Sequence, residues 1–256
     1  MTPDQQWRTS ISRVAPNEIR VRGYDLIELI GRRSFGDVVF LLLSGELPNG
    51  NEGRMTEACL VAASEHSVVA PSVAAARFVA SAGVPLQAAV AAGEAGLGDH
   101  HGGAVETCAR ALLDASETGW QDREAALEIA ARHKAEGKRL PGFGHVVHDP
   151  DPRAGRLLEV AEELGLRGRW CSMAEAFEEV TEDVFGRRLR MNVDGALAAI
   201  LLELGLDWRL GKAFYVIART PGFVAHAFEE QMRERPYRDV GWDNVSYDGP
   251  EDRPLQ

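Results

Sequence analysis

The sequence predicts a mainly all-α protein, and three observations support this fold class. The composition is rich in Ala, Leu, Glu and Arg, and 45% of the 256 residues are hydrophobic, which favours a globular helical chain with a substantial core. Apolar residues recur at helical spacing, as at Leu157, Leu158, Ala161 and Leu164. Residues 72–97 are dominated by Ala and Gly, small residues that let two helices approach closely.

Charge and cysteine content exclude several classes of protein. The net charge of -11 argues against general binding to nucleic acid or to an anionic membrane surface. Cys59, Cys108 and Cys171 are widely spaced and odd in number, so we expect no disulfide framework, no zinc motif and a cytoplasmic location. The N-terminus has no signal pattern, and the longest strongly apolar run, residues 38–43, is too short to span a membrane.

The first elements are a polar arm and a short helix. Residues 7–23 are polar and are interrupted by Pro16, which predicts an extended N-terminal arm. Leu26, Leu29 and Ile30 follow at helical spacing. We therefore expect a helix soon after residue 22.

The next segments predict buried and tightly packed helices. Residues 34–45 are apolar on nearly every side, which predicts a buried helix that ends at Gly45 and Pro48, with a short core strand as the alternative. Residues 54–66 predict another helix. The Ala- and Gly-rich residues 72–97 predict a helix pair and not a flexible linker.

The composition changes twice in the second half of the chain. Residues 105–139 carry many charges, and residues 154–190 contain clearly amphipathic segments. Apolar character returns in residues 196–204 and 213–228. We interpret residues 1–104 and 191–256 as one large helical domain and residues 105–190 as a smaller inserted domain.

One loop combines special backbone positions with ionisable side chains. In the run from Leu140 to His145, Pro141 fixes one φ, while Gly142 and Gly144 permit conformations and close approaches that side chains would block. His145 can donate or accept a proton near neutral pH. Arg153 offers a planar charged group that suits a carboxylate. The loop predicts a site for a small anionic substrate, although a plain surface turn has the same composition.

Two further motifs carry groups that could act in catalysis. Asp99, His100 and His101 invite a metal interpretation, but no further ligands follow at suitable spacing, so we expect no metal. The glycines after His101 favour a helix start, where an imidazole is kept neutral. Asp194 enters a very apolar helix and could simply be its N-cap; in a dry cleft its pKa would rise and it would become a candidate base.

These motifs, taken in order, resemble the citrate synthase superfamily over nearly the whole chain. The matching stretches are Arg22-Gly23-Tyr24, Ser34-Phe35, Leu41 to Pro48, Glu65-His66, His101 to Ala104, Pro141 to His145, Asp151 to Ala154, Asn192-Val193-Asp194 and Ala218-Arg219-Thr220. The resemblance implies a mostly helical enzyme with a large and a small domain, which works as a homodimer with shared active sites.

The resemblance also assigns roles to residues. It implies His101, His145 and Asp194 as the catalytic triad. It implies carboxylate binding by His66, Arg153 and Arg219, with Arg238 reaching the partner subunit's site. The loop Leu140-Pro141-Gly142-Phe143-Gly144 is similar to one that contacts coenzyme A, and Lys138 and Arg139 are candidates for its phosphates or are simply solvated charges.

The tail from Pro236 to Tyr247 resembles the citryl-CoA lyase branch of this superfamily, which includes the lyase module of ATP-citrate lyase. The expected reaction is cleavage of (3S)-citryl-CoA to acetyl-CoA and oxaloacetate. His145 would take the hydroxyl proton, His101 would bond the thioester oxygen and Asp194 would protonate the enolate carbon. No tightly bound cofactor is expected, since coenzyme A is part of the substrate.

Two alternatives remain open. His101 is the residue expected in the condensing enzymes, so a citrate or 2-methylcitrate synthase that joins an acyl-CoA to oxaloacetate is the first. An inactive paralogue that binds acyl-CoA is the second, and retention of the whole triad argues against it.

Overall fold

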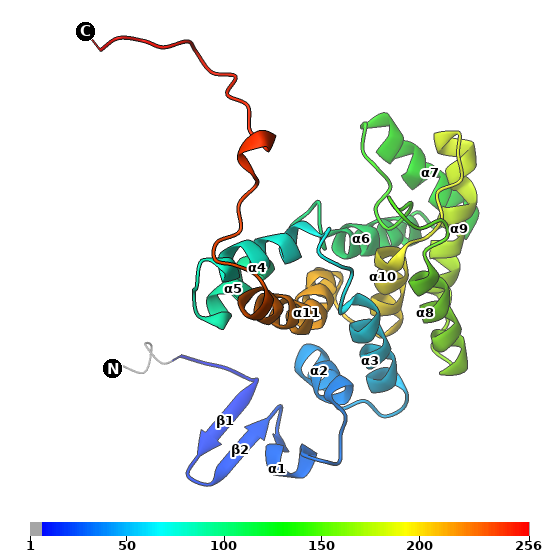
Figure 1. Cartoon of the computed structure of the whole chain (residues 1–256). Coiled ribbons are helices and arrows are strands. Elements are labelled where there is room, and N and C mark those ends of the chain that lie inside the picture. Colours follow the sequence, from blue (N-terminus) through cyan, green and yellow to red (C-terminus); the bar gives the residue numbers. More distant parts are fainter. Residues whose placement is uncertain (1–6, 256) are drawn as a thin grey trace. The chain divides into compact units, whose positions relative to one another are not determined.

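The computed structural model describes residues 7–255 and confirms the all-α fold class. Eleven α-helices lie in this part of the chain, together with a small antiparallel sheet and short 3-10 helices (Figure 1). No helix among these residues is both long enough and apolar enough to cross a membrane.

The N-terminal segment forms a small sheet instead of an extended arm. The strands are β1 (Ser12–Ala15), β2 (Glu18–Val21) and β3 (Tyr24–Asp25), paired antiparallel in that order. Asn17 takes a φ of 62° in the first turn, and Arg22 and Gly23 take φ values of 49° and 88° in the second. These two turns reverse the chain. The helix that follows, α1 (Leu26–Leu29), is a single turn.

Residues 35–44 form a helix, α2 (Phe35–Ser44), and not the alternative strand. The Ser34 side chain accepts a hydrogen bond from the amide of Asp37, and the Asp37 side chain accepts one from the amide of Ser34. This capping box fixes the start of the helix. Gly45 ends it with a φ of 94°, as the sequence predicts.

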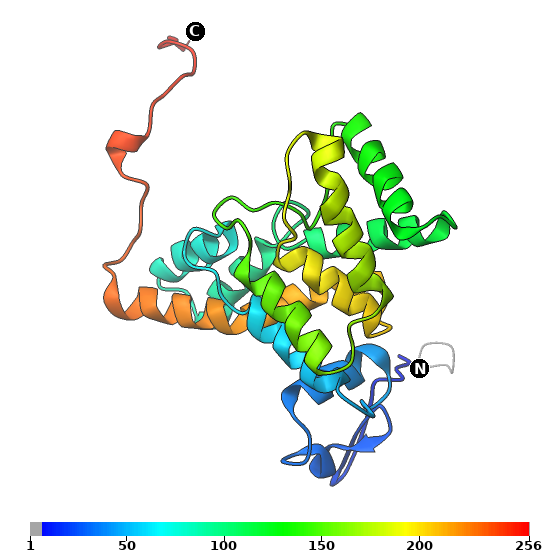
Figure 2. The same cartoon turned by 90° about the vertical axis from the view of Figure 1, so that its right-hand side faces the viewer.

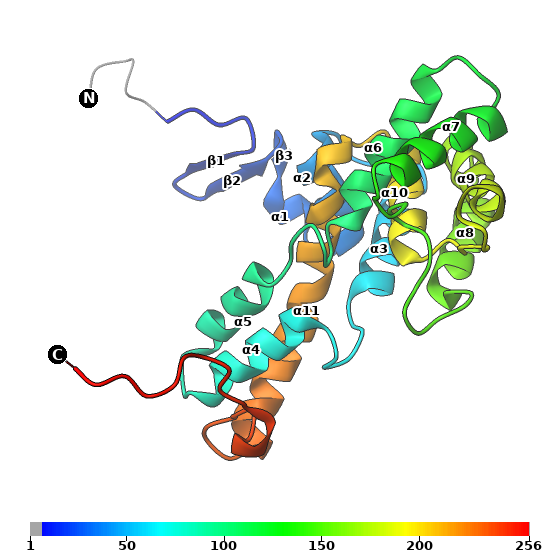
Figure 3. The same ribbon diagram turned by 90° about the horizontal axis from the view of Figure 1, so that it is seen from above.

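The Ala- and Gly-rich segment is a helix pair, as predicted. The helices are α4 (Pro71–Ser81) and α5 (Leu86–Ala95), which lie alongside each other (Figure 3). Ala80 and Ala89 are fully buried in their contact. The preceding helix, α3 (Glu52–Ala63), ends before His66, which therefore lies in a loop.

The middle of the chain supplies four helices. These are α6 (Ala104–Glu117), α7 (Asp122–Ala135), α8 (Pro152–Glu163) and α9 (Arg169–Phe185). Helices α7 and α9 pack side by side (Figures 1 and 2). The amphipathic character predicted for residues 154–190 is confirmed on α9, where Phe177, Val180 and Val184 are all buried.

The most apolar helix, α10 (Val193–Glu203), is the centre of the core. Every residue from Gly195 to Leu202 is buried, and α10 packs against α6, α8 and α9. The short 3-10 helix η2 (Trp208–Leu210) leads into α11 (Gly211–Arg233), which continues through Pro221, and η3 (Trp242–Asn244) lies in the tail. The rest of α10, packed on all sides, thus fixes the position of its first turn.

The contacts within the chain define two compact units. Among the described residues, 7–66 with 97–220 form the first, and 67–96 with 221–255 form the second. These units follow the packing of the backbone, whereas the division into 1–104 with 191–256 and 105–190 follows composition and stays a prediction.

Candidate active site

The loop from Leu140 to His145 is tied to the segment just before α10. The amide of Asn192 donates to the carbonyl of Gly142 at 3.0 Å, and its side-chain Nδ2 donates to the carbonyl of Gly144 at 2.7 Å. The amide of Gly144 donates to the carbonyl of Arg190 at 2.7 Å. These three bonds place His145 beside the helix start that carries Asp194.

Gly142 shows why the loop needs glycine. Its φ is 84°, in the region that side chains disfavour. A Cβ at this position would lie 2.7 Å from Cys108 Sγ and 2.8 Å from the Cα of Gly195. The loop therefore packs directly against the backbone of α10.

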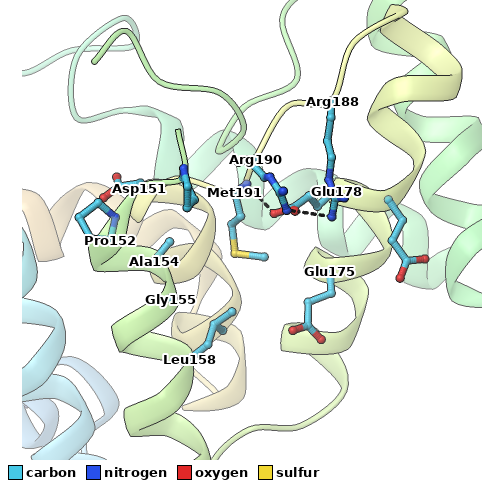
Figure 4. Close-up of a pocket in the computed structure, with 12 residues that line it drawn as sticks. Asp151, Pro152, Ala154, Gly155, Leu158, Glu175, Glu178, Arg188, Arg190 and Met191 are labelled. Carbon is cyan, nitrogen blue, oxygen red and sulfur yellow. Dashed lines mark hydrogen bonds and ion pairs between the residues drawn. The ribbon is translucent and has the colours of Figure 1, made fainter. Parts of the chain in front are cut away.

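The other side of this connection is held by Glu178 of α9. Its Oε1 accepts from Arg188 Nη2 and from Arg190 Nη1, both at 3.0 Å, and its Oε2 accepts from the amide of Met191 at 2.8 Å (Figure 4). The carboxylate thus fixes the residues that bind the loop. Its pKa is held below the ordinary value, because these hydrogen bonds outweigh the effect of burial.

The interpretation of Asp194 as an N-cap is wrong. The cap is Asn192, whose Oδ1 accepts from the amides of Asp194 and Gly195 at 2.9 and 3.2 Å. The Asp194 side chain is thus free to turn inward, where its Oδ1 is shielded from solvent and has no hydrogen-bond partner among the described residues. Burial raises the pKa of Asp194, although the hydroxyl of Tyr215 opposes this by a hydrogen bond.

Tyr215 is a site residue that the sequence analysis missed. It is buried on α11, one helical turn before Arg219, whose guanidinium carbon lies 5.4 Å from the centre of its ring. Its hydroxyl bonds Asp194, and burial raises the pKa of that hydroxyl. The spacing of four residues from Arg219 was the available signal, since it places both side chains on one helix face.

Arg219 is buried and only partly paired. Its Nε donates to the carbonyl of Ala63 at 2.7 Å, whereas its Nη1 is shielded from solvent and has no partner in the described chain. A buried guanidinium donor without an acceptor is costly. Arg219 is therefore suited to an anionic ligand.

Arg153 is held by Asp151, a residue of the matching motif to which the sequence analysis assigned no role. The Asp151 carboxylate accepts from Arg153 Nε and Nη2 at 3.0 and 2.8 Å, and also from the amide of Val193 at 3.0 Å. It also caps α8 through the amide of Arg153. One buried carboxylate thus joins Arg153 to the start of α10. Burial alone would raise the pKa of Asp151, but the bonds from Arg153 and the backbone lower it.

His101 lies at the end of a tight turn just before α6. The amide of His101 donates to the carbonyl of Gly98 at 2.9 Å, and the amide of Gly98 donates to the carbonyl of His101 at 2.8 Å. Burial, and then the charge of Arg219, lower the pKa of His101. The ring is therefore neutral at pH 7, as the sequence predicts. Asp99 of the same motif instead pairs with Lys212 at 2.8 Å.

The ring of His145 has a defined orientation. Its Nδ1 accepts from the amides of Val147 and His148, both at 3.0 Å. Burial lowers the pKa of His145, so the ring is neutral and carries its single proton on Nε2. His145 therefore presents an N–H donor, which differs from the proton acceptor expected from the sequence.

His66 and His148 lie next to this ring. His66 Nε2 is 3.3 Å from His148 Nε2, and the ring centres of His66 and His145 are 5.4 Å apart. Burial and the charge of Arg153 lower the pKa of His66. The structure thus brings together His66, His101, His145, Arg153, Asp194 and Arg219. Besides the contacts given above, the charges of Arg153 and Arg219 both act on His66 and Asp194, and the charge of Arg219 acts on His101.

A cavity of about 640 Å³ opens beside the loop. It is lined by the predicted Lys138, Arg139, Leu140, Phe143, Gly144 and His145, together with Arg187, Arg188 and Arg190 from the segment after α9. Lys138 is paired with Glu136 at 2.6 Å, and Arg188 and Arg190 are paired with Glu178. Arg139 and Arg187 make no ion pair within the described residues, so they are the cations available to an anionic ligand.

Arg238 belongs to the second compact unit, whereas the site residues described above belong to the first. It lies after α11, where its Nε and Nη2 both donate to the carboxylate of Glu230 at 2.8 Å. Glu230 is fully buried and also accepts from Arg77 Nε at 2.6 Å.

This mainly helical chain gathers neutral imidazoles, a shielded carboxyl group and two guanidinium groups near one loop, a set of groups suited to an enzyme that acts on an anionic substrate. The family model for citrate synthase, C-terminal domain, matches residues 50–239, and the chain belongs to this family. A citryl-CoA lyase of Hydrogenobacter thermophilus is 40% identical, with a TM-score of 0.91 over 98% of this chain and 97% of that one.

Other relatives are longer. The citrate/2-methylcitrate synthase of Bacillus subtilis is 34% identical over 82% of this chain, which covers 55% of that protein. An ATP citrate lyase of Methanosaeta concilii shares the fold, with a TM-score of 0.82 at 22% identity over 97% of this chain and 42% of its own. The chain thus spans about half or less of the length of these two relatives.

Proposed function

We propose that this protein is a citryl-CoA lyase, which cleaves (3S)-citryl-CoA to acetyl-CoA and oxaloacetate. The observation that carries the proposal is the 40% identity to a citryl-CoA lyase over almost the full length of both chains. The arrangement around the loop supports it, because it supplies the acid, the neutral imidazoles and the guanidinium groups that this reaction needs.

In the proposed reaction, the bond between the carbinol carbon and the CH₂ of the acetyl unit breaks. Neutral His101 donates a hydrogen bond to the thioester oxygen, where negative charge develops as the enolate forms. Asp194, whose pKa is raised by burial, gives its proton to the enolate carbon. Its unpaired Oδ1 leaves this carboxyl group free to face the substrate.

The proton of the tertiary hydroxyl leaves at the same time. His145 donates its Nε2–H to the hydroxyl oxygen and stabilises it as the carbonyl forms, and the departing proton passes to the neighbouring His66–His148 pair. One proton is thus lost and one is gained by the substrate atoms. Arg153 and the unpaired Nη1 of Arg219 hold the carboxylates and orient the bond.

We propose that the cavity beside the loop takes the coenzyme A part of the substrate. The free guanidinium groups of Arg139 and Arg187 suit phosphates, and the loop offers backbone groups to the pantetheine chain. Arg187→Glu should raise the KM for citryl-CoA about tenfold and leave inhibition by oxaloacetate unchanged. Arg123→Glu on α7 is the matched control, since Arg123 is outside the cavity.

We also propose a homodimer in which Arg238 completes the partner's site. Glu230 supports this role by holding the guanidinium in one orientation through two bonds. Asp194→Asn and Arg238→Ala should each be inactive alone, whereas mixed subunits should regain activity at one site of each hybrid dimer. Mixing without recovery of activity would contradict sharing of the active sites between subunits.

We also propose a cytoplasmic location, which the three free buried cysteines support.

The experiment that tests the function is incubation of the pure protein with citryl-CoA and identification of the products. Equal amounts of oxaloacetate and acetyl-CoA support lyase activity. No cleavage of citryl-CoA would refute it.

The second candidate is a citrate or 2-methylcitrate synthase. The specific observation in its favour is the 34% identity to the citrate/2-methylcitrate synthase of Bacillus subtilis. It predicts release of free coenzyme A from acetyl-CoA or propionyl-CoA with oxaloacetate, which requires hydrolysis of the thioester. Binding of acyl-CoA without any turnover would instead support an inactive paralogue.

A further inference from the structure

We propose that His66, His145 and His148 form a binding site for zinc or a similar divalent transition-metal ion, which competes with the substrate. One ring nitrogen from each residue lies within 4.8 Å of the other two. In the part of the chain that the structure describes, this is the only group of three potential ligands of this kind. It is distinct from Asp99-His100-His101, the motif that invited a metal interpretation in the sequence.

The distances fit a tetrahedral ion. Zinc binds imidazole nitrogen at about 2.05 Å, so two nitrogens on one tetrahedral ion lie about 3.3 Å apart. His66 Nε2 and His148 Nε2 are 3.3 Å apart. These two nitrogens can therefore bind one ion without a change in their separation.

The ring positions fit the same geometry for all three residues. With the same bond length, the centres of two imidazole rings on one zinc ion lie about 5.2 Å apart. The observed distances between ring centres are 5.4 Å for His66 and His145, 5.4 Å for His66 and His148, and 4.7 Å for His145 and His148. His145 joins as the third ligand when the ion displaces its Nε2 proton, and water fills the open position.

The surroundings support binding of moderate strength. The His66 ring also forms a hydrogen bond to its own backbone, the kind of contact that orients a ligand imidazole. Asp151 adds a favourable negative charge near His145, whereas Arg153 and Arg219 oppose a cation near His66. We therefore expect a reversible inhibitory ion and not a structural one.

The competition rests on the proposed function, but the metal site does not. An ion on these nitrogens removes the N–H donor of His145 and the imidazoles that receive the hydroxyl proton. Zinc should then raise the apparent KM for citryl-CoA, and a chelator should restore it. Direct binding can be measured without turnover, so the two ideas can fail separately.

The test measures binding of Zn²⁺ by calorimetry and of Co²⁺ by its visible spectrum, with tag-free protein. The wild type should bind one ion with the intense absorption of tetrahedral Co²⁺. His148→Asn should weaken binding by about 100-fold, because loss of a supporting group alone costs 10–100-fold. His66→Asn should do the same, which guards against a folding defect of one variant, and circular dichroism checks both. His100→Asn, which changes an exposed imidazole outside the cluster, should bind and cleave as the wild type does.

Two results would overturn the proposal. The first is a wild type that binds no ion, and the second is a His148→Asn variant that binds within twofold of the wild type. A third result would separate the two ideas. If Zn²⁺ binding is lost in His148→Asn, but Zn²⁺ does not affect cleavage of citryl-CoA by the wild type, the metal site is supported and the placement of the substrate at these imidazoles is refuted.

Discussion

Replacement of Asp194 by Asn is the most direct test of the proposed chemistry. Asn192 and not Asp194 caps α10, so the change leaves the cap intact. The amide keeps the shape of the carboxyl group and its contact with Tyr215, but it has no proton to give to the enolate carbon. General acid catalysis contributes about 10²–10⁴-fold, so we expect kcat to fall about 10³-fold, or about 4 kcal/mol of barrier, with KM changed much less.

The assay follows oxaloacetate formed from citryl-CoA by its reduction with NADH, over a range of pH. Because burial raises the pKa of Asp194, the wild type keeps its acid form above the ordinary pH range of an aspartic acid, and kcat should fall as the pH rises through this raised pKa. The residual rate of Asp194→Asn should lack this fall.

The same variant should lower kcat without lowering the free energy of unfolding. In the folded wild type the carboxyl group retains a proton that the unfolded chain has lost, so the free energy of unfolding falls as the pH rises from the ordinary to the raised pKa. Asp194→Asn removes this loss and should be at least as stable at pH 8 by urea unfolding. Asp99→Asn, at an exposed carboxylate paired with Lys212, is the matched control.

A kcat of Asp194→Asn within tenfold of the wild-type kcat would refute the role of Asp194.

Three further changes test how the site is built. Gly142→Ala should lower the free energy of unfolding by about 1–3 kcal/mol in urea titrations. The φ of Gly142 is 84°, and the Cβ of the new alanine would collide with Cys108 and Gly195. An unchanged urea midpoint would contradict the close packing of the loop. Asn192→Ala should cost about 1–2 kcal/mol through loss of the cap, and should also lower kcat because the bond to Gly144 is lost. Arg219→Lys should raise the KM for citryl-CoA about 10–100-fold, since lysine cannot bind both Ala63 and a carboxylate; an unchanged KM would argue against its role as a carboxylate ligand.

The sequence predicted the helices well, since their signals are local. The helical periodicity, the glycine at position 45 and the Ala-rich pair each depend on neighbouring residues, and the structure confirms them. The small N-terminal sheet was missed because it depends on two reversals of the chain, at Asn17 and at Arg22-Gly23, within a polar segment. Arg22 gave no local signal because arginine rarely takes a positive φ, whereas Asn17 and Gly23 are residue types that are common in turns.

The site was predicted less completely than the fold. Resemblance to a family pointed to six residues that the structure brings together, namely His66, His101, His145, Arg153, Asp194 and Arg219. The supporting residues Asp151, Tyr215 and Glu178 were missed, because each bonds a residue on a different element of the chain or acts through burial. The orientation of the His145 ring also depends on two amides whose direction only the folded loop defines.

The bonds between the loop and the start of α10 have a consequence for the order of folding. The longest-range of them joins Asn192 to Gly142, 50 residues apart in the chain. Closing a loop of that length costs about 3.5 kcal/mol of chain entropy, so these bonds cannot form early on their own. Helices α8 and α9 must first shorten the connection. The reactive groups should therefore meet late in folding, after the core around α10 has formed, and partly folded chains should lack a site that can bind the thioester.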